Sequence, residues 1–477
     1  MAARDFSRYF LYRWRYVIGY SLIGLLLVGL LVFAGLYLPG GLSDAETRSV
    51  VKSAAISFNG PSTLAITNLP YHLLQAGIFA VFGVSIFTIK LPSLLLALGS
   101  AIGFILLLRR WFKPNIAVLA SLIAISTGQF LFIAQSGTPS VLYIFWPVAL
   151  LLLGTQITRV KNRRLLWKLL FAITAALSLY TPLSIYPLIA IGLAVIFHPH
   201  LRNVLRRMKP VRLVIVSMAF AVLVAPLVWF IVTTPSLGVS LLGIPTQWPP
   251  DLLANANTVL RQYLIFWKPS DTEIMTPVFG LGSVLLITLG LYRLVRTRET
   301  TRSYLIIFWI VCLTPVLLLN PSFTSVTFLP SMLMLAAGLT SLISYWYRLF
   351  PLNPYARIVG LIPITILVGA LIVTGLLRYG YGYHYSPQVA NLFSRDVTFI
   401  PKDTTHFLVG SNEVAFYKAY AKYHPALIIE TVPSQSTFLA TRQAKDELKD
   451  TVTITRIITN GQSSQADRLY VMRRLHN

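Results

Sequence analysis

The most informative stretch of the sequence runs from residue 39 to residue 93 and reads PGGLSDAETRSVVKSAAISFNGPSTLAITNLPYHLLQAGIFAVFGVSIFTIKLPS. It follows a long apolar run and carries the carboxylates of Asp44 and Glu46. The chain between Phe6 and Gly380 holds only four other carboxylates, which are Asp251, Asp271, Glu273 and Glu299. A polar stretch of this kind between apolar runs is typical of a loop outside a membrane, with spans on both sides of it.

The composition excludes a soluble fold. Of the 477 residues, 56% are hydrophobic and 12% are charged, and the mean hydropathy is +0.70. A soluble protein of this size could not bury so much apolar surface, so we expect a polytopic membrane protein. The single cysteine, Cys312, excludes a disulfide framework or a cysteine metal site within the chain.

The net charge of +25 could indicate a nucleic-acid partner. The Lys and Arg residues, however, lie mainly in short clusters between apolar runs, which is the positive-inside pattern of membrane proteins. We therefore expect contact with membrane lipids and no nucleic acid.

Eleven apolar segments approach the roughly 20 residues that a membrane-spanning helix needs. They are 17–38, 91–108, 115–136, 139–157, 166–181, 183–197, 212–234, 276–294, 303–320, 326–346 and 357–378, although 166–197 could be one kinked span. With a cytoplasmic N-terminus, the basic clusters fall on the inner side, and the outer segments before the tail hold only Arg48, Lys52, Arg261 and Lys268. The pattern predicts a multi-pass plasma-membrane protein with an uncleaved first span.

Two regions follow from this topology. Residues 1–378 form a transmembrane domain with outer loops at 39–90 and 235–275, the second of which holds a predicted amphipathic helix over 251–267. Residues 379–477 are more polar and form a predicted small α/β extracytoplasmic domain with a structural or acceptor-binding role. We expect its strands at 406–410, 426–431, 451–458 and 468–474, and its helices at 412–422 and 442–448.

The acidic pair has a structural interpretation. Ser43 and Glu46 have the spacing of a capping box, in which each side chain bonds the other residue's amide at a helix start. Asp44 would then favour the positive end of the helix dipole. A functional interpretation competes with this one, because five of the six carboxylates fall on the predicted outer side and none lies in a span. Secondary transport usually needs ionisable groups inside the spans, so the pattern favours chemistry at the outer surface.

The motifs that follow the acidic pair carry a resemblance. In order they are Leu69-Pro70-Tyr71-His72, Phe82-Gly83 and Lys90-Leu91-Pro92-Ser93. The series resembles the first outer loop of the GT-C membrane glycosyltransferases, in the family 39-like branch of protein O-mannosyltransferases and aminoarabinose transferases. The resemblance is strongest over residues 39–110 and implies a GT-C-like fold, mainly α, of about 11 transmembrane helices.

The resemblance also implies site residues. A loop-one carboxylate would be the catalytic base, and both Asp44 and Glu46 stay open, because Asp-Ala-Glu stands here for the family's adjacent Asp-Glu. The substrate-binding candidates are Arg48, Tyr71, His72, Lys90, Arg261 and Lys268. His72 could equally be an interfacial structural residue, and Tyr71 and Trp267 could belong to the aromatic belt. Two departures are Lys90 in place of the family's arginine and Gln135 in a region where relatives often carry one.

The implied activity is transfer of a hexosyl or pentosyl group from a polyprenyl-phosphate donor, with inversion, to a protein, lipid or glycan acceptor at the outer face. We expect no cofactor and no divalent metal, because no His and Asp cluster has ligand spacing. Two alternatives stay open. One is a catalytically inactive relative acting as an envelope-assembly scaffold, and the other is a lipid-sugar transporter or flippase.

Overall fold

The structure is a computed structural model that describes residues 10–36, 42–56, 61–159, 164–206, 210–245, 248–266, 277–349, 354–384, 397–448, 452–459 and 468–474. The chain divides into two compact units. The helical unit comprises residues 1–32, 95–134 and 140–379, and the mixed unit comprises 33–94, 135–139 and 380–477. The mixed unit takes in the whole of loop one as well as the tail, and the predicted division of the chain at residue 378 stays a prediction.

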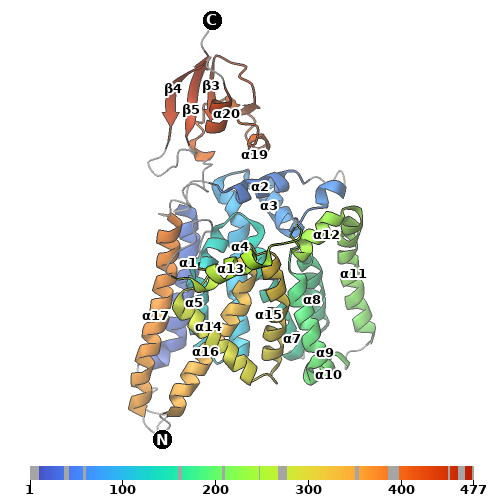
Figure 1. Cartoon of the computed structure of the whole chain (residues 1–477), viewed down its shortest axis with the longest axis vertical. Coiled ribbons are helices and arrows are strands. Elements are labelled where there is room, and N and C mark those ends of the chain that lie inside the picture. Colours follow the sequence, from blue (N-terminus) through green and yellow to red (C-terminus); the bar gives the residue numbers. More distant parts are fainter. Residues whose placement is uncertain are drawn as a thin grey trace. The chain divides into compact units, whose positions relative to one another are not determined.

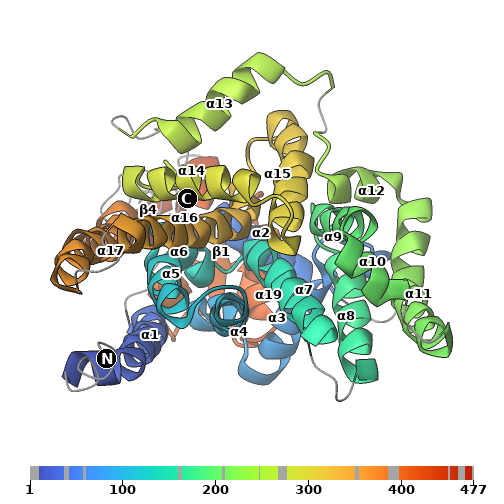
Figure 2. The ribbon, with the colours of Figure 1, turned by 90° about the horizontal axis from the view of Figure 1, so that it is seen from below.

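The helical unit is built mainly from long helices, as Figures 1 and 2 show. Helix α1 (Phe10–Leu36), helix α4 (Ile86–Trp111) and helix α17 (Pro354–His384) belong to it over most of their length. The others are α5 (Pro114–Ser126), α6 (Gly128–Gln135), α7 (Leu142–Arg159), α8 (Arg164–Ser178), α9 (Ile185–Phe197), α10 (Pro199–Arg206), α11 (Pro210–Thr233), α12 (Pro235–Leu242), α13 (Leu252–Leu264), α14 (Leu281–Arg296), α15 (Thr301–Leu319) and α16 (Phe328–Leu349).

Each predicted span overlaps a helix, but the number eleven is not confirmed. Among the described residues, six helices are long and apolar enough to cross a membrane, or up to eight if each bent pair is one span. The bent pairs are α5 with α6, at 59°, and α9 with α10, at 90°. The predicted span at 166–181 corresponds to α8, which has 15 residues, and the one at 276–294 corresponds to α14, which has 16.

Close helix packing depends on small residues. Helices α14 and α16 run alongside each other in Figure 2, and Gly290 and Gly338 face each other at their contact. A Cβ at Gly290 would collide with the backbone of Met334, and one at Gly338 with the backbone of Leu286. Glycine at both positions therefore lets the two backbones touch, which is a common way to pack membrane helices.

The mixed unit combines loop one with the tail. Loop one supplies α2 (Asp44–Ala54), α3 (Leu69–Phe82) and the first residues of α4. The tail supplies a five-stranded sheet of order β2-β1-β3-β5-β4 and the helices α19 (Val414–Ala421) and α20 (Arg442–Glu447). The strands are β1 (His406–Leu408), β2 (Ile428–Glu430), β3 (Thr437–Thr441), β4 (Val452–Ile458) and β5 (Leu469–Arg474).

The predicted strands and helices of the tail are confirmed, and β3 is an additional strand that the sequence pattern did not predict. Strand β1 pairs parallel with β2 and β3, whereas β5 pairs antiparallel with β3 and β4. Strand β3 is thus the centre of the sheet, since it joins the parallel half to the antiparallel half.

One hydrophobic core joins the tail to loop one. Phe407 of β1 and Phe416 of α19 belong to the same buried cluster as Val50 of α2 and Phe79 of α3. Helix α19 packs directly against α2, and the ring of Tyr423 meets the ring of Phe79 at 6.4 Å between centroids. Burying such aromatic side chains contributes on the order of 2 kcal/mol each, so the tail stabilises the placement of α2 and α3.

Candidate functional site: the acidic helix of loop one

Helix α2 begins with the capping box that the sequence predicts. The Glu46 amide donates to the Ser43 hydroxyl oxygen at 3.3 Å, and the Ser43 amide donates to Glu46 Oε2 at 2.8 Å. Asp44 lies in the first turn and is exposed. The structural interpretation of this stretch is therefore confirmed.

The Glu46 carboxylate is fully buried and heavily bonded. Its Oε2 also accepts from the Ser43 hydroxyl at 3.0 Å. Its Oε1 accepts from the Gly137 amide at 2.7 Å and lies 3.5 Å from Nζ of Lys90. Glu46 is 0% exposed and Lys90 is 2% exposed. Both oxygens of the Glu46 carboxylate therefore have partners. Through these contacts, the carboxylate links the start of α2 to Gly137 and to Lys90 on α4.

A second buried network joins α2 to α3 and α4. Gln75 Oε1 accepts from the hydroxyls of Ser49, at 3.0 Å, and Ser53, at 2.6 Å, while Gln75 Nε2 donates to the carbonyl of Ile89 at 2.9 Å. The Ser53 hydroxyl oxygen also lies 2.8 Å from Nδ1 of His72. Since Ser53 has one proton and donates it to Gln75, His72 must donate from Nδ1, which assigns its tautomer.

Burial and the nearby charge of Lys52 lower the pKa of His72 to about 4. The imidazole is therefore neutral at pH 7, with Nε2 unprotonated.

Tyr71 is also fully buried. Its hydroxyl lies 2.8 Å from that of Ser93, and burial raises the pKa of Tyr71. The Ser93 hydroxyl in turn donates to the Thr138 carbonyl at 3.0 Å. Thus Tyr71, His72 and Lys90, which the sequence suggested as substrate ligands, all make buried protein contacts in this structure, and their substrate-binding roles stay predictions.

The exposed face of α2 has a different character. Asp44, Arg48 and Lys52 follow one another at intervals of four residues, and all three are exposed. Residues four apart lie on the same side of a helix, so one carboxylate and two cations share this face. Arg261, another predicted ligand, is exposed on α13 of the helical unit, and Lys268 lies outside the described residues.

Sequence reasoning missed Gln75 and the segment from Ser136 to Thr138. A signal for Gln75 existed, because it is the one amide in the apolar helix α3 and stands three residues after His72, on the same face. The role of Gly137 had no such signal, since its amide meets Glu46 across 91 residues of sequence. Among the described residues, no group of three or more His, Cys, Asp or Glu side chains could hold a metal ion, and the expectation of no resident metal stays a prediction.

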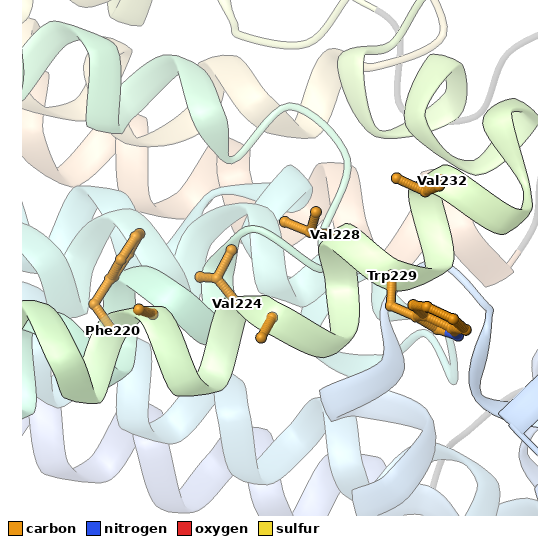
Figure 3. A pocket seen from close by; sticks show the side chains of 7 residues that line it. Phe220, Val224, Val228, Trp229 and Val232 are labelled. Atoms are coloured by element: carbon orange, nitrogen blue, oxygen red, sulfur yellow. The ribbon is translucent and has the colours of Figure 1, made fainter.

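A hollow in the helical unit lies on α11 and is lined by apolar side chains alone. Figure 3 shows its apolar lining, which comprises Phe220, Ala221, Val224, Ala225, Val228, Trp229 and Val232. No titratable side chain lines it. Trp229 is 62% exposed, as expected for the lipid-facing side of a span.

The fold is similar to those of two proteins solved with a polyprenyl phosphate. ArnT from Cupriavidus metallidurans, solved bound to undecaprenyl phosphate, superimposes with a TM-score of 0.51 at 12% identity, covering 95% of this chain and 98% of ArnT. The archaeal oligosaccharyltransferase AglB from Archaeoglobus fulgidus, solved with an inhibitory peptide and a dolichol-phosphate, gives 0.50 at 13% identity, covering 88% of this chain and 65% of AglB.

A family model agrees with the fold. Residues 69–229 match the model of the dolichyl-phosphate-mannose-protein mannosyltransferases. The predicted resemblance to the GT-C glycosyltransferases, in the branch of protein O-mannosyltransferases and aminoarabinose transferases, is thereby confirmed. No curated protein sequence matches the chain.

We predict that Lys90→Met destabilises the protein by about 3–5 kcal/mol, because it leaves the buried Glu46 carboxylate without its cation. Adding Glu46→Gln to Lys90→Met should recover part of that loss, since no buried charge then remains. Chemical unfolding in detergent measures both effects, with the exposed Lys418→Met as the control. A double variant no more stable than Lys90→Met would contradict the pairing.

We also predict a stability change at acid pH. Because the folded pKa of His72, about 4, lies below that of a free histidine, protonation favours the unfolded chain. The stabilisation is complete above about pH 6.5 and is lost as the pH falls from there towards 4, by about 3 kcal/mol in total. His72→Gln should remove this pH dependence and the exposed His200→Gln should retain it; an unchanged slope in His72→Gln would contradict the assignment.

Proposed function

We propose that the chain is a membrane glycosyltransferase that moves a sugar from a polyprenyl-phosphate donor to an acceptor hydroxyl, with Asp44 as the general base. The observation that carries the proposal is that the two carboxylates of α2 lie in different environments. Glu46 is buried and bonded on both oxygens, whereas Asp44 shares the exposed face with Arg48 and Lys52.

The spacing on α2 suits the chemistry. Each interval of four residues advances about 6 Å along a helix, so Arg48 stands about 6 Å and Lys52 about 12 Å beyond Asp44. A carboxylate at one end can take a proton from an acceptor while cations further along bind an anion. A sugar phosphate placed along this face would meet both kinds of group.

The reaction we propose is a single displacement. The acceptor oxygen forms a bond to the anomeric carbon as the bond from that carbon to the phosphate oxygen breaks, which inverts the configuration. Asp44 takes the acceptor proton, and the leaving polyprenyl phosphate keeps the bonding electron pair. Arg48 and Lys52 stabilise the negative charge that develops on the phosphate.

Burial decides our choice between the two carboxylates. A base must reach the proton that it removes, directly or through one water. Glu46 is 0% exposed, and a proton transfer to it would break the capping box and the pair with Lys90. Asp44 is exposed, so an acceptor can reach it, and we assign catalysis to Asp44 and positioning of α2 to Glu46.

The neighbours support the class of donor and one class of acceptor. ArnT is known with undecaprenyl phosphate, AglB with a dolichol-phosphate and a peptide, and the matching family model is that of protein mannosyltransferases. We accordingly propose a polyprenyl-phosphate sugar as the donor and a protein as the first acceptor to test, with lipid and glycan acceptors as alternatives. Our proposal places the site and the tail on the outer face of a plasma membrane, and the N-terminus in the cytoplasm.

We predict that Asp44→Asn lowers turnover by about 10²–10⁴, the usual contribution of a general base, with a nearly unchanged KM for the donor. The measurement is transfer of radiolabel from a polyprenyl-phosphate mannose by the reconstituted protein. Asp403→Asn, which removes an exposed carboxylate from the tail, is the matched control. Transfer at the wild-type rate by Asp44→Asn would contradict the assignment. If neither the wild type nor Asp44→Asn transferred the sugar, the result would favour a catalytically inactive scaffold protein.

A further inference from the structure

Helix α10 is short and lies across the end of α9. It begins at Pro199 after a bend of 90°, and none of its residues is buried. At 100° per residue, Leu201, Val204 and Leu205 fall on one side, and Arg202 and Arg206 fall together on another. If α9 crosses the membrane, α10 runs in the membrane plane with an apolar side and a basic side.

The bend is held against the turn between α14 and α15. His198, which is 9% exposed, donates from Nε2 to the Glu299 carbonyl at 3.1 Å and lies 3.3 Å from the Thr301 hydroxyl. Its ring also packs edge-on against that of Tyr304, with centroids 5.4 Å apart. These contacts bring the start of α10 next to the residues that follow α14.

That turn adds further cations. Arg296, at the end of α14, and Arg298 are exposed, and Glu299 is the one carboxylate next to them in the sequence. Within the described parts of the chain, no ion pair joins Arg202, Arg206, Arg296 or Arg298 to a carboxylate. Arg302 behaves differently, because it donates to the Trp111 carbonyl and lies 4.9 Å from the centre of the Phe112 ring. The fold thus engages Arg302 internally and leaves the other four arginines facing outward.

We propose that this basic corner, formed by His200, Arg202, Arg206, Arg296 and Arg298, binds the headgroups of acidic phospholipids in the leaflet that it faces. An in-plane amphipathic helix places its apolar side among the acyl chains and its basic side at the depth of the headgroup phosphates. Basic groups between neighbouring helices at that depth are suited to anionic headgroups. The phosphates supply the negative charge that the described carboxylates do not.

The test uses the purified full chain in detergent and native mass spectrometry with added phosphatidylglycerol or phosphatidylcholine. We expect the wild type to retain phosphatidylglycerol in preference to phosphatidylcholine. Each arginine contributes about fivefold, so Arg202→Gln with Arg206→Gln should bind phosphatidylglycerol about 25-fold more weakly. Arg298→Gln alone, in the turn, should lose about fivefold. Lys418→Gln with Lys422→Gln removes two exposed cations at the same four-residue spacing from the tail and should change nothing.

Other outcomes would overturn the proposal. Equal retention of the two lipids by the wild type would mean that no specific lipid surface exists. The same conclusion would follow if the tail variant lost as much phosphatidylglycerol binding as the arginine variants. Competition by glycerol phosphate as strong as that by phosphatidylglycerol would indicate a site for free phosphate. Loss of a co-purifying protein with unchanged lipid retention would assign the corner to a protein partner. The readout does not depend on sugar transfer, so its failure is separate from failure of the proposed reaction.

Discussion

The buried carboxylate of Glu46 is the constraint on which the loop-one helices depend. A carboxylate removed from water is costly unless its oxygens are bonded, and here the bonds come from the start of α2, from Gly137 and from Lys90 on α4. Satisfying this one charge therefore fixes three segments that are far apart in the sequence. It also fixes which face of α2 remains exposed. A helix anchored through Glu46 must point Asp44, two residues earlier, away from the anchor, because two residues turn a helix by about 200°.

The second constraint is the hydrophobic core that loop one shares with the tail. Phe79 of α3 and Val50 of α2 lie in one cluster with Phe407 and Phe416 of the α/β segment. Helix α19 packs against α2 from the tail, as α3 does from loop one, so both segments supply the surface that buries α2. The tail is consequently part of the support of the candidate site, in addition to any contact that it makes with an acceptor. This arrangement agrees with the general rule that a site is held rigid by the packing and hydrogen bonds behind it.

Much of the fold and part of the candidate site could be predicted from local sequence patterns. The capping box at Ser43 and Glu46, the order of the loop-one motifs, and four of the five tail strands depend on residues close together in sequence, and the structure has them. What could not be predicted depends on distant packing. Whether Asp44 or Glu46 is buried is decided by Gly137 and Lys90, and strand β3 is stabilised by pairing with β1 and β5 on either side. An apolar run also does not reveal where its helix bends, as the breaks after Ser126 and Phe197 show, or how short that helix is, as α8 and α14 show. The predicted number of spans therefore exceeds the number of helices, among the described residues, that are long enough to cross.

The most direct test of the central claim is a structure of the protein with a bound polyprenyl phosphate. We expect the phosphate on the exposed face of α2, within hydrogen-bond distance of Arg48 or Lys52, with Asp44 accessible to an acceptor and the Glu46–Lys90 pair intact. A phosphate bound by Lys90 with that pair broken, or a phosphate bound away from α2 altogether, would contradict it.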